Sequence, residues 1–242
     1  MIERLKQWTL GRQSRPALLM RAMLGIAEAG DGELTRQLAA SLSAAPVGPG
    51  LAAQAWRLIE LMDVGPAPRD RVEGLLTLLH SFPAPNLPLV MPTGAVIADP
   101  VSAALAGEAL ALRALTKARR HRDRAVRDRL DALARRGPDM EGVTRRASAL
   151  HGLAADAVHH PLAVARLTAE IARAQHADGK WTDIDPFHVG QALLSVEGAD
   201  AERALRRGAR ALAKEQREDG GFGSEERSWI ACRWALRAAA IL

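Results

Sequence analysis

Apolar residues recur with helical spacing along most of the chain. Leu51, Ala55 and Leu58, for example, lie four and three positions apart, which places them on one face of a helix. No segment alternates apolar and polar residues for long enough to predict a strand. We therefore predict an all-α domain of about eleven helices, with short connections between most of them. The clearest helical patterns cover 17–28, 51–62, 71–82, 101–116, 126–133, 144–157, 162–174, 187–196, 201–214 and 228–241.

Local signals mark several helix boundaries. Ser14 precedes Pro16, and the pairs Asp99-Pro100 and Asp185-Pro186 place a capping side chain next to a proline suited to the first helical turn. Glycines follow several of the patterns, where helices are expected to end.

One connection is different from the others. Residues 83–98 contain four prolines and cannot form a regular helix. Three interpretations stay open: a lid over a functional site, a plain crossover between helical layers, or a boundary between two halves. We treat 1–242 as a single domain.

Composition limits the class of protein. Apolar residues make up 48% of the chain, which is typical of a folded globular domain, and no apolar run is long enough to span a membrane. The first residues lack the apolar core of a signal peptide. A single cysteine, Cys232, excludes an internal disulfide. We expect a cytoplasmic protein.

Segment 117–136 is strongly basic, with nine lysines and arginines and three aspartates. Val126, Leu130 and Leu133 still form an apolar stripe, which favours an amphipathic helix on the outside of the fold. The alternative is contact with phosphate, an acidic partner or a membrane surface. Because no aromatic residue interleaves with the arginines and no nucleic-acid motif is present, we expect no nucleic-acid partner.

A repeated motif gives the most specific signal. Gln175, Asp178, Gly179 and Trp181 recur 41 residues later as Gln216, Asp219, Gly220 and Phe222. A fixed period of this size indicates stacked helical units. The glutamine amide can donate to free carbonyls at a helix end, Asp-Gly makes a tight turn, and the aromatic ring packs against the next hairpin. The motif thus predicts a clamp between neighbouring pairs of helices.

This Gln-x-x-Asp-Gly-x-Trp/Phe repeat resembles that of the terpenoid cyclases and protein prenyltransferase β-subunits, squalene–hopene cyclase among them. The resemblance covers about 160–242 and implies an (α/α) toroid, closed or incomplete, with inner helices around a central cavity. It places the helices beginning near residues 100, 143, 186 and 228 inside and those near 121, 160 and 201 outside. It also implies an isoprenoid or other apolar small molecule as substrate.

Class II terpenoid cyclases carry an Asp-x-Asp-Asp motif whose middle acid protonates the substrate. The chain reads Asp183-Ile-Asp185-Pro186, so the resemblance assigns the acid to Asp185, assisted by Asp183 and His188. The alternative for Asp185 is a helix cap. Aromatic side chains stabilise carbocations, and residues that would line the cavity are Phe187, Trp229, Trp234 and His151. The alternative for His151 is a hydrogen-bonded residue of the core.

Zinc, as in the protein prenyltransferases, is an alternative that would use Asp185, His188 and Cys232, although their spacing departs from that family's pattern. Because no other metal or nucleotide motif is present, we expect no cofactor and no bound metal. The sequence thus predicts an enzyme of acid-initiated cyclisation or isomerisation. The alternative is a non-catalytic helical toroid that binds a protein, a peptide or a lipid.

Overall fold

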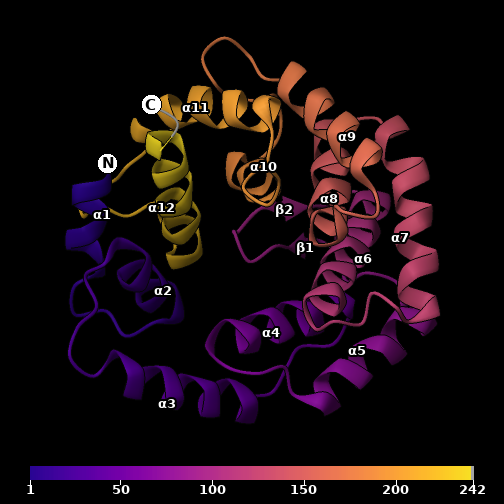
Figure 1. Cartoon of the computed structure of the whole chain (residues 1–242), viewed down its shortest axis with the longest axis horizontal. Coiled ribbons are helices and arrows are strands. Elements are labelled where there is room, and N and C mark those ends of the chain that lie inside the picture. The colour runs from indigo at the N-terminus through magenta and orange to yellow at the C-terminus, as the bar shows by residue number, and fades with distance from the viewer. Residues whose placement is uncertain (241–242) are drawn as a thin grey trace.

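The computed structural model describes residues 1–240 and is predominantly helical over that range, as the apolar pattern predicts (Figure 1). The helices are α1 (Ile2–Thr9), α2 (Arg15–Leu24), α3 (Asp31–Ala44), α4 (Leu51–Val64), α5 (Arg69–Ser81), α6 (Pro100–Lys117), α7 (Arg124–Arg136), α8 (Val143–Leu153), α9 (Pro161–Arg173), α10 (Pro186–Leu193), α11 (Ala199–Ala213) and α12 (Glu225–Ala240). Short 3-10 turns follow α7 and α8 at Gly137–Asp139 and Ala154–Asp156.

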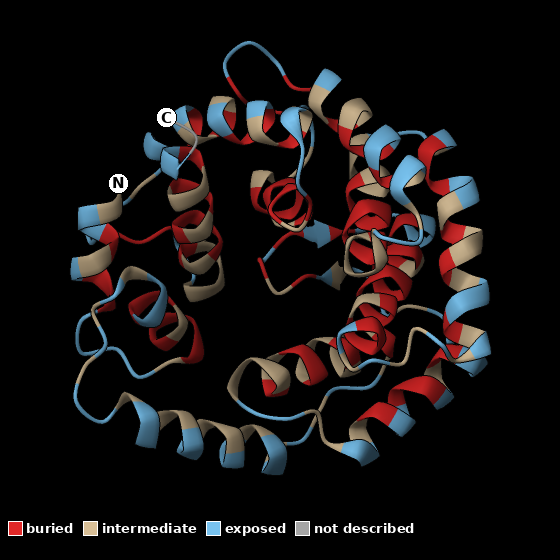
Figure 2. Ribbon diagram, in the orientation of Figure 1, coloured by how far each residue is buried: buried red, intermediate tan, exposed pale blue. Residues whose placement is uncertain are grey.

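The helices alternate between an inner and an outer position. In Figure 1, α2, α4, α6, α8, α10 and α12 lie toward the middle, and α1, α3, α5, α7, α9 and α11 lie around them. The first and last helices lie side by side, because α1 and α2 pack against α12. Buried residues concentrate on the inner helices and on the inward faces of the outer ones (Figure 2).

Small residues let the inner helices α6, α8, α10 and α12 approach closely. A Cβ on Gly152 of α8 would lie 3.0 Å from the Cα of Ala109 on α6. Gly190 of α10 faces the indole of Trp234 on α12, which is buried. These contacts form a densely packed wall along one side of the molecule.

The second part of the basic segment 117–136 forms α7, from Arg124 to Arg136, with the orientation that the apolar stripe predicts. Val126, Leu130 and Leu133 are fully buried, while the Arg124 side chain is 88% exposed. Two arginines on its inward edge, Arg129 and Arg136, pair with the buried carboxylate of Glu108 on α6.

The proline-rich segment contains a short β-hairpin that the sequence pattern did not predict. Strands β1 (Leu89–Val90) and β2 (Val96–Ile97) pair antiparallel, and each has only two residues, too few for an alternating pattern. Met91, Ala95 and Ile97 pack against the first turns of α6. At the hairpin tip, the carbonyl oxygen of Thr93 accepts a hydrogen bond of 2.7 Å from Arg227 Nε on α12.

Within residues 1–240, no helix combines the length and the apolar character that crossing a bilayer requires.

Candidate functional site: a charged pocket between the inner helices

The repeated motif makes equivalent contacts at its two copies. Gln175 Nε2 donates to the carbonyls of Gly179 (2.9 Å) and Ala204 on α11 (3.0 Å). Gln216 Nε2 donates to the carbonyls of Gly220 (2.8 Å) and Met1 (3.2 Å). The first copy therefore joins α9 to α11, and the second joins α11 to the start of α1.

The Asp-Gly turns of the two copies also make equivalent contacts. A Cβ on Gly179 would collide with the backbone of Arg207 on α11, and one on Gly220 would collide with the backbone of Arg4 on α1. Both glycines also have positive φ, of 90° and 89°, which favours glycine. Helix α1 thus occupies, after the second copy, the place that α11 occupies after the first.

Asp185 is the N-cap of α10, and both of its oxygens have partners. Oδ1 accepts a hydrogen bond of 2.8 Å from the Phe187 backbone N–H, and Oδ2 forms an ion pair with Arg227. Asp183 is exposed, with a φ of 54°. The structure brings neither carboxylate to the pockets described below. The capping role of Asp185 accounts for its position.

The two inner histidines are buried. His188 Nε2 lies 3.1 Å from Ser148 Oγ on α8, and burial lowers the pKa of its imidazole. Burial lowers the pKa of His151 much further, and the charge of Arg113 adds to the effect. Both rings are therefore neutral near pH 7.

The four predicted cavity residues have different surroundings. Phe187 packs edge-on against Phe222, with ring centroids 6.0 Å apart, and lies beneath the Arg227 guanidinium. Trp234 donates from Nε1 to the carbonyl of Leu205 on α11 and is part of the wall. Trp229 borders a central pocket. His151 is packed within α8 beside that pocket's cations.

This central pocket, which we call the charged pocket, has a volume of about 200 Å³. Its lining comes from the inner helices α2, α4, α6, α10 and α12, and it is rich in ionisable side chains. The charged residues that line it are Arg15, Asp63, Arg113, Lys117, Glu226 and Arg233.

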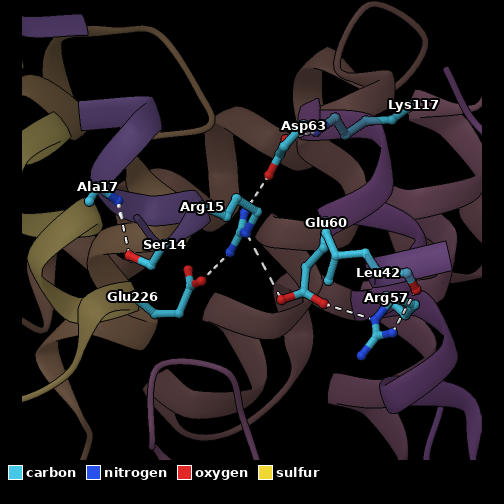
Figure 3. A network of polar contacts seen from close by, with 9 residues as sticks. All are labelled: Ser14, Arg15, Ala17, Leu42, Arg57, Glu60, Asp63, Lys117 and Glu226. Carbon is cyan, nitrogen blue, oxygen red and sulfur yellow. Dashed lines mark hydrogen bonds and ion pairs between the residues drawn. The ribbon is translucent and has the colours of Figure 1, made fainter. Parts of the chain in front are cut away.

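Arg15 connects three helices on one side of the charged pocket (Figure 3). Its guanidinium, on α2, pairs with Asp63 of α4 at 2.5 Å and with Glu226 of α12, and Glu60 of α4 lies 3.9 Å away. Lys117 of α6 reaches Asp63 at 3.4 Å. Burial raises the pKa of Glu226, and the nearby carboxylates of Glu60 and Asp63 act in the same direction, while Arg15 opposes them.

Arg113 and Arg233 also line the charged pocket. Arg113 donates to the carbonyl of His151 at 3.3 Å, and the Arg233 guanidinium lies over the Trp229 ring at 5.7 Å from its centroid. Among residues 1–240, neither guanidinium forms an ion pair with a carboxylate. Burial lowers the pKa of Arg113 to about 10, and the charge of Arg233 contributes.

A second pocket, which we call the apolar pocket, lies between α4, α6 and the proline-rich segment, with a volume of about 360 Å³. Apolar side chains dominate its lining, and Trp56 borders both this pocket and the charged pocket. Its lining includes Trp56 of α4, Leu89 and Met91 of the proline-rich segment, and Ala104 and Gly107 of α6.

The structure gives the zinc alternative no support. In the part of the chain that is described, no three histidine, cysteine or acidic side chains converge so as to hold a metal ion. Cys232 is fully buried in the core, and burial raises the pKa of its thiol to about 11.

Sequence reasoning missed most of the charged pocket, including Arg15, Asp63, Arg113, Glu226 and Arg233. One signal was present: Arg113 is the one charged residue in the otherwise apolar stretch 109–115. A charge in that position needs a specific environment, because isolated buried charges are costly.

Comparisons of the chain with protein-family models, with curated proteins and with solved structures find no match in any of the three.

Proposed function

We propose that the chain is a small (α/α) toroid similar in architecture to the terpenoid cyclases and that it binds a lipid-like or isoprenoid molecule in the apolar pocket. The alternating inner and outer helices and the two equivalent glutamine clamps support the architecture. No relative supports the family, so the assignment rests on these features of the chain itself.

The apolar pocket is the observation that carries the ligand class. Its volume of about 360 Å³ lies within the range typical of small-molecule sites, and its lining is mostly aliphatic and aromatic. The proline-rich hairpin forms one side of it, which gives this segment a role as a cover.

Binding without acid catalysis is the version of this function that the geometry favours. An acid-initiated reaction needs a carboxylic acid free to donate a proton to the ligand. Asp185 instead accepts from a backbone N–H and pairs with Arg227, and Asp183 points to solvent from an exposed turn.

Farnesol, an uncharged isoprenoid alcohol, tests the proposal, with dodecanol as a straight-chain comparison. We expect binding that quenches tryptophan fluorescence. Ala104→Phe fills the apolar pocket and should weaken farnesol binding by roughly tenfold or more, since a ligand without space loses most of its buried contacts. Ala40→Phe, on the exposed face of α3, is the matched control and should bind as the unmodified protein does.

Two outcomes would count against the proposal. Unchanged farnesol affinity in a folded Ala104→Phe variant would contradict the ligand site. Turnover of a polyprenyl substrate that Asp185→Asn abolishes would favour the acid-initiated enzyme instead.

A further inference from the structure

The charged pocket has an excess of positive charge. Four cationic side chains and two carboxylates line it, which leaves two positive charges unmatched by the lining. The two carboxylates, Asp63 and Glu226, are both engaged with Arg15, and Lys117 shares Asp63. The unmatched charge therefore belongs to Arg113 and Arg233.

These two arginines are held in place without a carboxylate. Arg113 is anchored by the backbone of α8 and Arg233 by the face of Trp229, and both residues line the charged pocket. Burial lowers the pKa of each, and a neighbouring arginine adds to the effect in both cases. Two like charges in such a place are unfavourable unless a counter-charge joins them.

The neighbouring groups supply no such counter-charge within residues 1–240. His151 lies beside Arg113 as a neutral, buried ring whose Nε2 has no hydrogen-bond partner in the described chain. Arg237, on the same helix as Arg233, adds a further positive charge. The carboxylate of Asp63 raises the pKa of both arginines, but Arg15 and Lys117 already bind it.

We infer that the charged pocket binds a small phosphate-type dianion, either inorganic phosphate or the phosphate group of a small monoester, between Arg113 and Arg233. Planar guanidinium groups bind phosphate oxygens in pairs, and a charge of about −2 matches the excess of the lining. The volume of about 200 Å³ limits the ligand to a small molecule. This site does not depend on the function proposed for the apolar pocket.

Thermal unfolding and calorimetric titration with inorganic phosphate test the inference, against sodium chloride of equal ionic strength. We expect phosphate to raise the midpoint of unfolding while chloride does not, because a ligand that binds only the folded state stabilises it. Glycerol phosphate in a second arm distinguishes a monoester from the free anion: tighter binding identifies the monoester, and equal or weaker binding identifies the free anion.

Arg233→Gln should weaken phosphate binding by roughly tenfold or more, since it removes a charge-assisted contact. In the absence of phosphate the same variant should unfold at a higher temperature than the unmodified protein, because a repulsion is relieved. Arg233→Lys keeps the charge and should retain part of the affinity. Arg210→Gln, exposed on α11, is the control and should leave phosphate binding unchanged.

Either of two results would overturn the inference. One is the absence of any stabilisation by phosphate beyond that of chloride. The other is equal phosphate affinity in the unmodified protein and in a folded Arg233→Gln variant.

Discussion

Helices α3 and α7 both lie on the outside of the molecule, with 14 and 13 residues, but different forces hold them in place (Figure 2). Helix α7 buries Val126, Leu130 and Leu133 completely, whereas α3 buries no residue. Polar contacts hold α3 at its two ends instead. Arg21 binds Asp31 at its start, and Arg57 donates to the carbonyl of Leu42 near its end.

The same difference extends to the inner helices. On the α7 side, α8 packs on α6 through Gly152 and Ala109, and α10 packs on α12 through Gly190 and Trp234; the buried carboxylate there, Glu108 of α6, pairs with two arginines of α7. On the α3 side, Arg15 joins α2 to α4 and α12 through carboxylates. The stability contributed by the α7 side should therefore depend mainly on side-chain size, and that contributed by the α3 side mainly on ionisation.

Truncation of one leucine on each outer helix gives the largest expected contrast. Leu130→Ala on α7 should cost about 3 kcal/mol of unfolding free energy, because it leaves a cavity in a fully buried site. Leu38→Ala on α3 should cost about 1 kcal/mol, because its side chain is only partly buried. Urea unfolding of the two variants measures both values. Equal costs would show that α3 is packed as tightly as α7.

Gly190→Ala tests the close packing of the inner wall. An added Cβ would overlap the Trp234 ring, so we expect a loss of roughly 2 kcal/mol. In a Trp234→Leu background the same substitution should cost much less, because the overlapping ring is gone. Urea unfolding of the double-mutant cycle measures this coupling, and additive free energies would contradict the proposed overlap. Gly74→Ala on α5 is a control, since nothing lies within 4 Å of an added Cβ there.

This contrast also explains which elements the sequence could predict. The helical patterns over 101–116 and 126–133 correspond to α6 and α7. The buried face of α6 is mostly alanine and leucine, and α7 buries the stripe of Val126, Leu130 and Leu133. Helices α1 and α3 were not predicted. Helix α1 has only eight residues, and the apolar face of α3 stays partly exposed, so its pattern is weak.

The charged pocket could not be predicted from the sequence for a different reason. Arg15, Asp63 and Glu226 come from three helices, and Arg15 lies 211 residues away from Glu226. Each residue alone is a typical surface charge, and only the arrangement of the helices buries them together. Each glutamine clamp, by contrast, combines a hydrogen bond within its own turn with one to a neighbouring helix. The residues of the turn are close together in the sequence and are therefore visible as a motif.

The pH dependence of stability tests the ionic side of the comparison, with the smallest expected effect. The pKa of Glu226 is raised in the folded protein above the ordinary value of 4.5, so folding favours its protonated form. The stability that this group contributes is present below pH 4.5 and is lost as the pH rises through the raised pKa. Glu226→Gln lacks this loss, so the difference between its unfolding free energy and that of the unmodified protein should shift in favour of the variant as the pH rises from about 4.5 to about 7.5.

Glu33→Gln on α3 should show the opposite sign. The Arg36 side chain lowers the pKa of Glu33, so the ionised carboxylate stabilises the folded protein above pH 4.5, and this stability is lost as the pH falls. As the pH rises, the unfolding free energy of the Glu33→Gln variant should therefore fall relative to that of the unmodified protein, while that of the Glu226→Gln variant should rise. Urea unfolding across this range measures both slopes. If the unfolding free energies of Glu226→Gln and of the unmodified protein changed with pH in the same way, folding would not alter the pKa of the carboxylate beside Arg15. The ionic account of the α3 side would then be wrong.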